Sequence, residues 1–197
     1  EFLLSFAWRR LLIWFGDKDI STNLCNRIYG KSQIAKYIPG NVFHVVGRHI
    51  LGSQAGIKHI VLVGATVYEI LGLLSISILI GFSGMVIFGL GNIYFSLYQI
   101  ILILFSTIVI TSLITALAPY LMRLRGIILP YRGIWETVIN ISKVYGFYLI
   151  FFLIAGLLLV IIVNLFLDID IDINITAKLV VIFSIAWLAG FIIPGAP

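Results

Sequence analysis

Four long apolar runs constrain this chain more than any other feature of its sequence. A helix needs about 20 apolar residues to cross about 30 Å of hydrocarbon, and these runs approach or exceed that length. Apolar residues make up 61% of the 197 residues and charged residues only 11%. These charged residues are too few to cover the surface of a soluble globular domain of this size. The sequence therefore predicts an all-α, polytopic transmembrane helical bundle with spans near residues 57–80, 93–117, 144–167 and 178–193.

The organisation predicted from these runs is a single integral membrane domain, residues 1–197, without room for a second sizeable soluble domain. Residues 1–15 are apolar but carry Arg9 and Arg10, and they are too short to span a bilayer. They predict either a partial spanning helix or an interfacial amphipathic helix. Since both ends of the sequence run apolar, we expect a fragment of a longer bundle.

The basic residues predict an orientation. The net charge of +5 comes from short polar segments between the spans, which favours contact with anionic lipid over nucleic acid. By the positive-inside rule, loops 16–40 and 121–136 face the cytoplasm, and we expect the plasma (inner) membrane. The connections 81–92 and 168–172 then face outward. Lys36, Arg123 and Arg125 are candidate contacts to lipid headgroups, although basic residues at these positions also serve only to set topology.

Two Pro-Gly pairs predict breaks beside apolar helices, Pro39-Gly40 and Pro194-Gly195. The segment after the first pair is too short and too polar for an ordinary span, so it predicts a short broken or re-entrant helix. Non-helical backbone at membrane depth is tolerated only where protein or a water-filled cavity covers it. Paired broken helices also accompany internal repeats in transporters, which these two short matches suggest only as a hypothesis.

Glu69 is the outstanding polar residue, because it lies near the middle of the first predicted span. A carboxylate at that depth is costly and marks a substrate or proton site by default, whereas the structural alternative is a glutamate that binds helices together. Arg48 precedes the span and either pairs with Glu69, binds a phosphate, or snorkels to the headgroups. We predict that His44, Arg48 and Glu69 bind substrate, with His44 as a polar lining residue.

Catalytic and metal-binding patterns are lacking in the sequence. His44 and His49 are five residues apart and so do not share a helix face, and the DIDID run lacks the glycine and glutamate of a calcium loop. There is no nucleophile elbow, phosphate-binding glycine loop or zinc motif. We predict no metal, cofactor or catalytic residue, and a transporter-like protein rather than an enzyme.

A family resemblance rests on two segments. KYIPGNVFHVVGR (Lys36–Arg48), followed by Glu69 within a span, is similar to the signature of flippase-like membrane proteins, the family named for the transmembrane region of lysylphosphatidylglycerol synthetase. AWLAGFIIPGAP (Ala186–Pro197) resembles the approach to that family's second signature, which continues there to Gly-x-Arg-Glu. The resemblance implies a bundle of about eight spans in complete members, with broken helices near the active region, and work on membrane lipids.

The resemblance and the residues together predict translocation of a charged or glycan-bearing lipid for cell-envelope synthesis. Arg48 would bind the phosphate, and Glu69 would balance its charge or change protonation. The expected partners are membrane lipids, anionic or polyprenyl-linked. The alternative is a non-transporting membrane subunit that scaffolds a glycosyltransferase or another envelope-biosynthesis enzyme, with Arg48 and Glu69 as packing elements.

Overall fold

The computed structural model describes residues 1–16, 20–37, 43–89, 96, 98–99, 101–102, 105–106, 134–167 and 172–193. Regular structure in these residues is all helical, which confirms the predicted fold class. Outside them lie Pro39, Gly40, Pro194, Gly195, Arg123, Arg125 and most of the predicted span 93–117. The helices are α1 (Phe2–Phe15), α2 (Thr22–Gln33), η1 (Ile34–Tyr37), α3 (Phe43–Gln54), α4 (His59–Phe88), α6 (Ile134–Leu167) and α7 (Ile173–Ile192).

Within the part of the chain that the structure describes, three helices are long and apolar enough to cross a membrane: α4 with 30 residues, the 29-residue stretch Ile139–Leu167 of α6, and α7 with 20 residues. They confirm a membrane protein with transmembrane helices. α4 continues to Phe88, so the connection predicted to begin at residue 81 is wrong for residues 81–88. The reason is that Gly81 and Gly84 do not break the helix but let α7 approach, and a Cβ on Gly84 would overlap the Val181 side chain.

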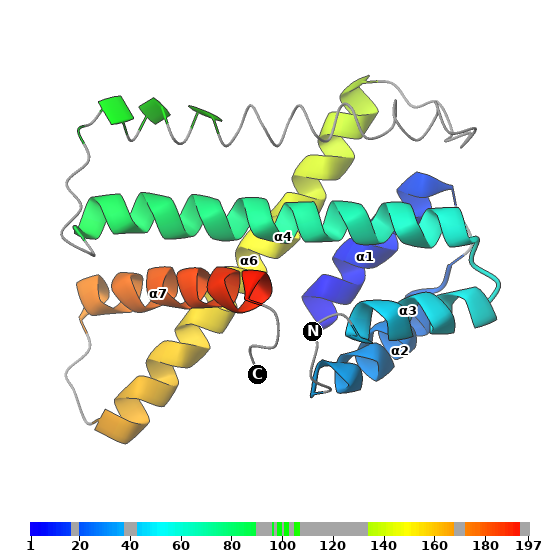
Figure 1. Ribbon diagram of the computed structural model, residues 1–197, viewed down its shortest axis with the longest axis horizontal. Coiled ribbons are helices and arrows are strands. Elements are labelled where there is room, and N and C mark those ends of the chain that lie inside the picture. The colour runs from blue at the N-terminus through cyan, green and yellow to red at the C-terminus, as the bar shows by residue number, and fades with distance from the viewer. Residues whose placement is uncertain are drawn as a thin grey trace.

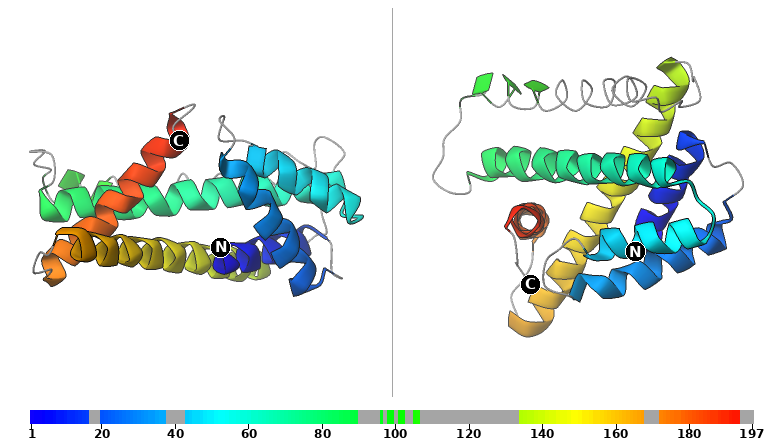
Figure 2. Two further views of the ribbon diagram at one scale, coloured as in Figure 1. Left: turned by 90° about the horizontal axis from the view of Figure 1, so that it is seen from below. Right: turned by 45° about the vertical axis from the view of Figure 1, so that its right-hand side comes forward.

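The helices form a bundle in which α4 and α7 pack side by side and α6 crosses both (Figure 1). α1 packs between α4 and α6, and α2 and α3 pack against each other at the same end of the molecule. Two further views also show α1, α2 and α3 grouped at one end of α4 and α7 near its other end (Figure 2). The α1–α3 group therefore caps one half of α4, and α7 covers the other half.

α1 belongs to the core of this group. Its Ala7, Trp8 and Leu12 are fully buried against α4, α6 and α2. Arg9 donates a hydrogen bond to the carbonyl oxygen of Ile20, and Arg10 donates one to the side-chain oxygen of Asn140 on α6. Both arginines therefore bind protein groups.

Residues 22–33 form a helix where the sequence predicted only a polar loop, so that part of the loop 16–40 is wrong. Ser21 caps the helix by accepting a hydrogen bond from the amide of Leu24. The buried side chains recur at the helical spacing of three and four, which is the signal that the polar composition concealed. They are Cys25, Ile28, Tyr29 and Ser32.

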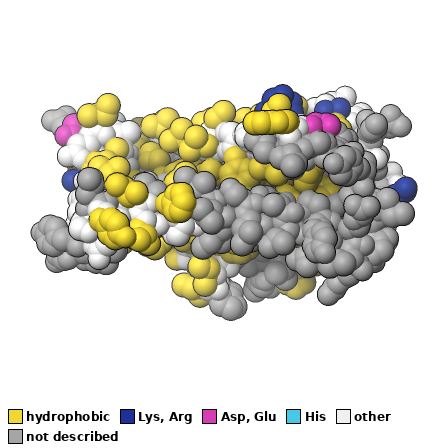
Figure 3. Space-filling model, turned by 90° about the horizontal axis from the view of Figure 1, so that it is seen from above, with side chains coloured by type: hydrophobic (Ala, Val, Ile, Leu, Met, Phe, Trp, Pro, Cys, Tyr) yellow, Lys and Arg dark blue, Asp and Glu magenta, His cyan; other side chains and the backbone are white. Residues whose placement is uncertain are grey.

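The outer surface is apolar over the long helices. Only 11% of the most apolar stretch of α6 is buried, against 33% of that of α4. Figure 3 shows hydrophobic side chains over the middle of the described surface, with charged ones at the left edge and over the right-hand half. Such a surface is stable only in a lipid environment.

Candidate functional site

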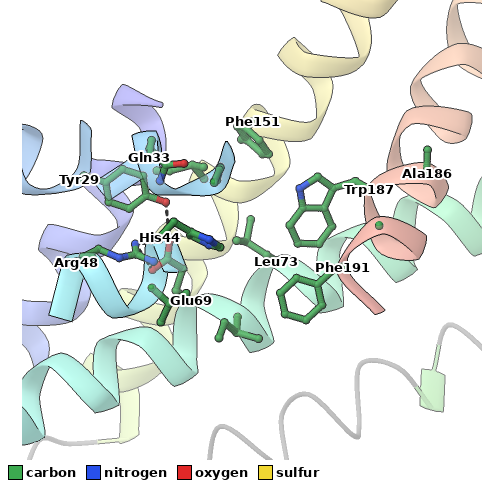
Figure 4. Close-up of a pocket in the computed structure, with 15 residues that line it drawn as sticks. Tyr29, Gln33, His44, Arg48, Glu69, Leu73, Phe151, Ala186, Trp187 and Phe191 are labelled. Atoms are coloured by element: carbon green, nitrogen blue, oxygen red, sulfur yellow. Dashed lines mark hydrogen bonds and ion pairs between the residues drawn. The ribbon is translucent and has the colours of Figure 1, made fainter. Parts of the chain in front are cut away.

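A cavity of about 300 Å³ lies where the α1–α3 group meets α4, α6 and α7 (Figure 4). All three residues predicted to bind substrate, His44, Arg48 and Glu69, line it, as does the predicted headgroup contact Lys36. The remaining lining residues are Leu4, Tyr29, Gln33, Val45, Ile70, Leu73, Phe151, Ala186, Trp187, Gly190 and Phe191. The structure thus joins residues separated by more than a hundred positions in the sequence.

Arg48 and Glu69 form a buried ion pair at the wall of the cavity. Nη1 of Arg48 lies 2.8 Å from Oε1 and 2.6 Å from Oε2 of Glu69. The two residues are 3% and 2% exposed, so solvent does not screen the attraction. Of the sequence alternatives for Arg48, the structure has the pairing with Glu69. Removing either charge alone would leave the other unpaired in the interior.

Aromatic rings from two helices complete the surroundings of Arg48. Its guanidinium carbon lies 4.5 Å from the centre of the Tyr29 ring and 5.5 Å from that of Trp8, within cation–π range. Burial acts to lower the pKa of Arg48, but Glu69 and Tyr29 together outweigh burial and the net shift is upward. Arg48 is therefore a fixed positive charge at every accessible pH.

Tyr29 is the third member of the buried cluster and was missed in the sequence. Its hydroxyl donates to Oε1 of Glu69 at 2.6 Å. Burial, and then the Glu69 charge, raise the pKa of Tyr29 well above its ordinary value, so the phenol stays protonated and remains a donor. Tyr29 lies on the buried face of α2, a helix where the sequence predicted a loop.

The local fold explains how the cluster forms. His44 and Arg48 are four residues apart on α3, so they share one face of that helix. Gly56, at φ 85°, turns the chain from α3 into α4. Gly52 lies against Leu62, where a Cβ would come within 2.6 Å of its side chain, so α3 can lie close to α4 and reach Glu69.

Several polar atoms at the α2–α3 end of the cavity lack hydrogen-bond partners. They are Nε2 and Oε1 of Gln33, Nδ1 of His44 and Nε of Arg48. Burial, and then Lys36 and Arg48, lower the pKa of His44 to about 4, so it is a neutral ring at pH 7. Because buried polar groups are nearly always paired, this end of the cavity suits a ligand, or waters, with both donors and acceptors.

The opposite wall of the cavity is apolar and aromatic. Trp187 and Phe191 stack with ring centres 5.6 Å apart and planes 13° from parallel, and Phe152 meets Trp187 edge-on. Leu73 lies between this wall and the polar end (Figure 4). The place of Trp187 in the cavity wall depends on the packing of α7 against α4 and α6. The cavity is therefore amphipathic, as a lipid is.

A histidine pair outside the cavity was also missed. Nε2 of His49 lies 2.9 Å from Nδ1 of His59, and the rings stack 5.1 Å apart. The turn between α3 and α4 brings together residues ten apart in the sequence, a separation that does not correspond to one helix face. The described residues hold no group of three potential metal ligands.

No protein family, curated protein or solved structure matches this chain. The resemblance to flippase-like membrane proteins therefore stays a prediction from the two sequence segments.

Proposed function

We propose that this protein binds the headgroup of a charged or glycan-bearing membrane lipid in the cavity and moves that lipid across the plasma membrane. The supporting observation is the cavity itself, which has unpartnered polar atoms at one end and aromatic side chains at the other, within a helical membrane protein. A volume of about 300 Å³ is at the lower end of ligand sites. It suits a headgroup whose chains extend into the bilayer.

In this proposal the polar residues of the cavity bind the lipid headgroup and the aromatic residues contact the lipid chains. Gln33 and His44 exchange hydrogen bonds with phosphate or hydroxyl groups, and the Lys36 ammonium attracts the negative charge. The unpartnered Nε of Arg48 offers a further donor. Trp187 and Phe191 contact the first carbons of the chains. Translocation for cell-envelope synthesis, with a cytoplasmic α2, follows from the sequence resemblance and the positive-inside rule.

Lipid binding can be tested by mass spectrometry of the lipids retained by the gently purified protein. We expect enrichment of one charged or glycan-bearing species over its share in the membrane. Gln33→Leu should remove the enrichment, because it deletes a donor and an acceptor at the polar end. Leu165→Ala is the matched control, since Leu165 is 77% exposed on α6 and does not line the cavity.

Translocation needs a second assay, in which a fluorescent analogue of the enriched lipid is reconstituted into liposomes and its outer-leaflet share is quenched. We expect the protected share to fall in the presence of the protein and to recover in Gln33→Leu. Retention of bulk lipids in ordinary proportions, with no movement, would contradict the proposal. That result would favour the alternative, a membrane subunit that scaffolds an envelope-biosynthesis enzyme.

A further inference from the structure

The buried cluster around Glu69 is electrically neutral as the structure stands. Arg48 supplies one positive charge and Glu69 one negative charge, and both are almost completely buried. Tyr29 is a neutral donor to the pair. Both ionised residues also line the cavity. An anionic group that enters the polar end therefore meets a buried ion pair whose charges already balance, and the exposed Lys36, whose ammonium lies 3.7 Å from the Glu1 carboxylate.

An entering anion would leave one uncompensated negative charge in this interior. Such a charge is too costly to remain, so the site must exclude the anion, gain a cation or lose a negative charge. The structure offers an attachment point, since Nη1 alone holds both carboxylate oxygens and Nε has no partner. The guanidinium can thus begin to bind a second acceptor before Glu69 leaves.

The titratable groups around the cluster indicate which residue can compensate the charge of an entering anion. The titratable lining residues besides Glu69 are Tyr29 of α2, Lys36 of η1, and His44 and Arg48 of α3, while the lining residues of α1 and α7 do not titrate. Tyr148 of α6 does not line the cavity, but its buried ring lies against Gly72 of α4. Arg48 and Tyr29 already carry their protons. Lys36 is exposed and lies 3.7 Å from Glu1. Among the described residues of the cavity, Glu69 is the group whose negative charge a proton can remove.

Neutral Glu69 would retain a hydrogen-bonding partner. The Tyr29 hydroxyl already contacts Oε1. Tyr148 is fully buried, its hydroxyl has no partner, and its ring lies on Gly72, where a Cβ would meet Cε2 at 2.5 Å. Gly72 is three residues after Glu69 and hence on the same face of α4. The Tyr148 ring thus lies against the face of α4 that carries Glu69, and its hydroxyl group is buried without a hydrogen-bond partner.

We propose that an anionic lipid headgroup displaces Glu69 from Arg48 and that Glu69 takes up one proton from water in the same step. The site changes from an Arg48–Glu69 pair to an Arg48–headgroup pair beside a neutral carboxylic acid, so one negative charge and one proton enter together. No covalent bond other than that to the proton is made. This inference rests on the proposed function, which it extends by making lipid loading proton-coupled.

The test is a proton count on the wild-type protein. Short-chain phosphatidylglycerol is added to the purified full chain in weakly buffered detergent containing a pH indicator, with phosphatidylcholine as the zwitterionic control. We expect one proton taken up per bound phosphatidylglycerol, none with phosphatidylcholine, and affinity that rises tenfold for each unit fall in pH. Binding of phosphatidylglycerol without proton uptake, at constant affinity, overturns the inference and leaves the proposed function standing. Failure of phosphatidylglycerol to bind also overturns the inference, whereas the proposed function is then decided by the lipids that the purified protein retains.

Two variants assign the proton. Glu69→Gln should bind phosphatidylglycerol with no proton uptake and no pH dependence, because the amide is already neutral. His44→Asn is expected to weaken binding but to keep the count at one proton per bound lipid. A count of zero in His44→Asn would place the proton on His44 and overturn the assignment. If Glu69→Gln does not fold, the wild-type count and the His44 variant still decide the question.

Discussion

The α1–α3 end of the molecule buries polar atoms, whereas the α6–α7 pair exposes apolar ones. At the first end, an ion pair, a tyrosine hydroxyl and an amide lie inside a core of tryptophan and leucine side chains. At the other, α4 and α7 meet through Gly81 and Gly84, and most of the long helices face outward. α4 takes part in both, with Glu69 in one half and the two glycines in the other.

The difference indicates which interaction stabilises each region. Lipid tails are as apolar as leucine, so burial gives little drive for helices to associate, and close packing through small residues must supply it. The glycine contact should therefore respond to added volume and not to charge. The stability of the buried cluster should depend on charge, since one unpaired buried charge destabilises the fold more than the loss of both charges does.

The largest effect is expected from breaking the ion pair. Arg48→Ala leaves Glu69 buried without its partner, and we expect a loss of about 3–5 kcal/mol in the free energy of unfolding. A reversible SDS titration in mixed micelles, followed by tryptophan fluorescence, measures it.

The double variant Arg48→Met, Glu69→Met provides the control, because replacing a buried pair by apolar groups is often neutral or stabilising. It should regain most of the stability lost in Arg48→Ala. A double variant as unstable as the single one would show that shape, rather than charge, governs this end.

The glycine contact should give the next largest effect. The added methyl group in Gly84→Ala overlaps Val181 of α7, so we expect a loss of about 1–3 kcal/mol from overpacking. Gly146→Ala in α6 is the matched control, because a Cβ there meets nothing within 4 Å. It should stabilise the helix by about 0.5–1 kcal/mol. Equal effects of the two substitutions, in the same SDS titration, would remove the close approach as the reason for Gly84.

The sequence predicted the helical fold and the apolar character of α4, α6 and α7, because apolar runs of membrane length have few other uses. It failed where a residue has two roles. Glycines at 81 and 84 signal a turn in a soluble chain but a contact in a membrane helix. Likewise, α2 was concealed because its exposed face is polar, although its buried positions keep helical spacing.

The site was predicted only in part. His44, Arg48 and Glu69 were found because a charge or imidazole near a span is unusual in itself. Gln33, Tyr29 and Trp187 are unremarkable in sequence and become cavity residues only through the packing of α2 and α7 on α4. Charge and hydropathy locate costly groups, whereas neutral hydrogen-bonding and aromatic partners depend on tertiary contacts.

A smaller effect is expected at the start of α7, in the region governed by packing. The Asp172 carboxylate accepts a hydrogen bond from the amide of Ile175 at 2.7 Å and so caps the helix. Asp172→Ala should cost about 1 kcal/mol in the SDS titration, and Asp172→Asn should restore nearly all of it. If Asp172→Ala has no effect, the hydrogen bond from the Ile175 amide does not stabilise the start of α7.

The smallest effect should be a pH dependence confined to the α1–α3 end. The pKa of His44 falls to about 4 from 6.5 because burial, Lys36 and Arg48 disfavour its charged form. Between these values the unfolded chain binds more protons than the folded one, so stability is full above pH 6.5 and falls as the pH drops toward 4. Since His44 is only half-buried, we expect less than about 1 kcal/mol, or at most about 2–4 °C in thermal midpoint.

His44→Asn should remove its share of this acid loss, whereas Gly146→Ala should shift the midpoint equally at every pH. His49 has a lowered pKa from burial and the neighbouring His59, so it contributes in the same direction. Comparison with His49→Asn separates the two. An acid loss unchanged in both variants would place the titrating group elsewhere, and the contrast between a charge-governed and a volume-governed end would then have to rest on Arg48 and Gly84 alone.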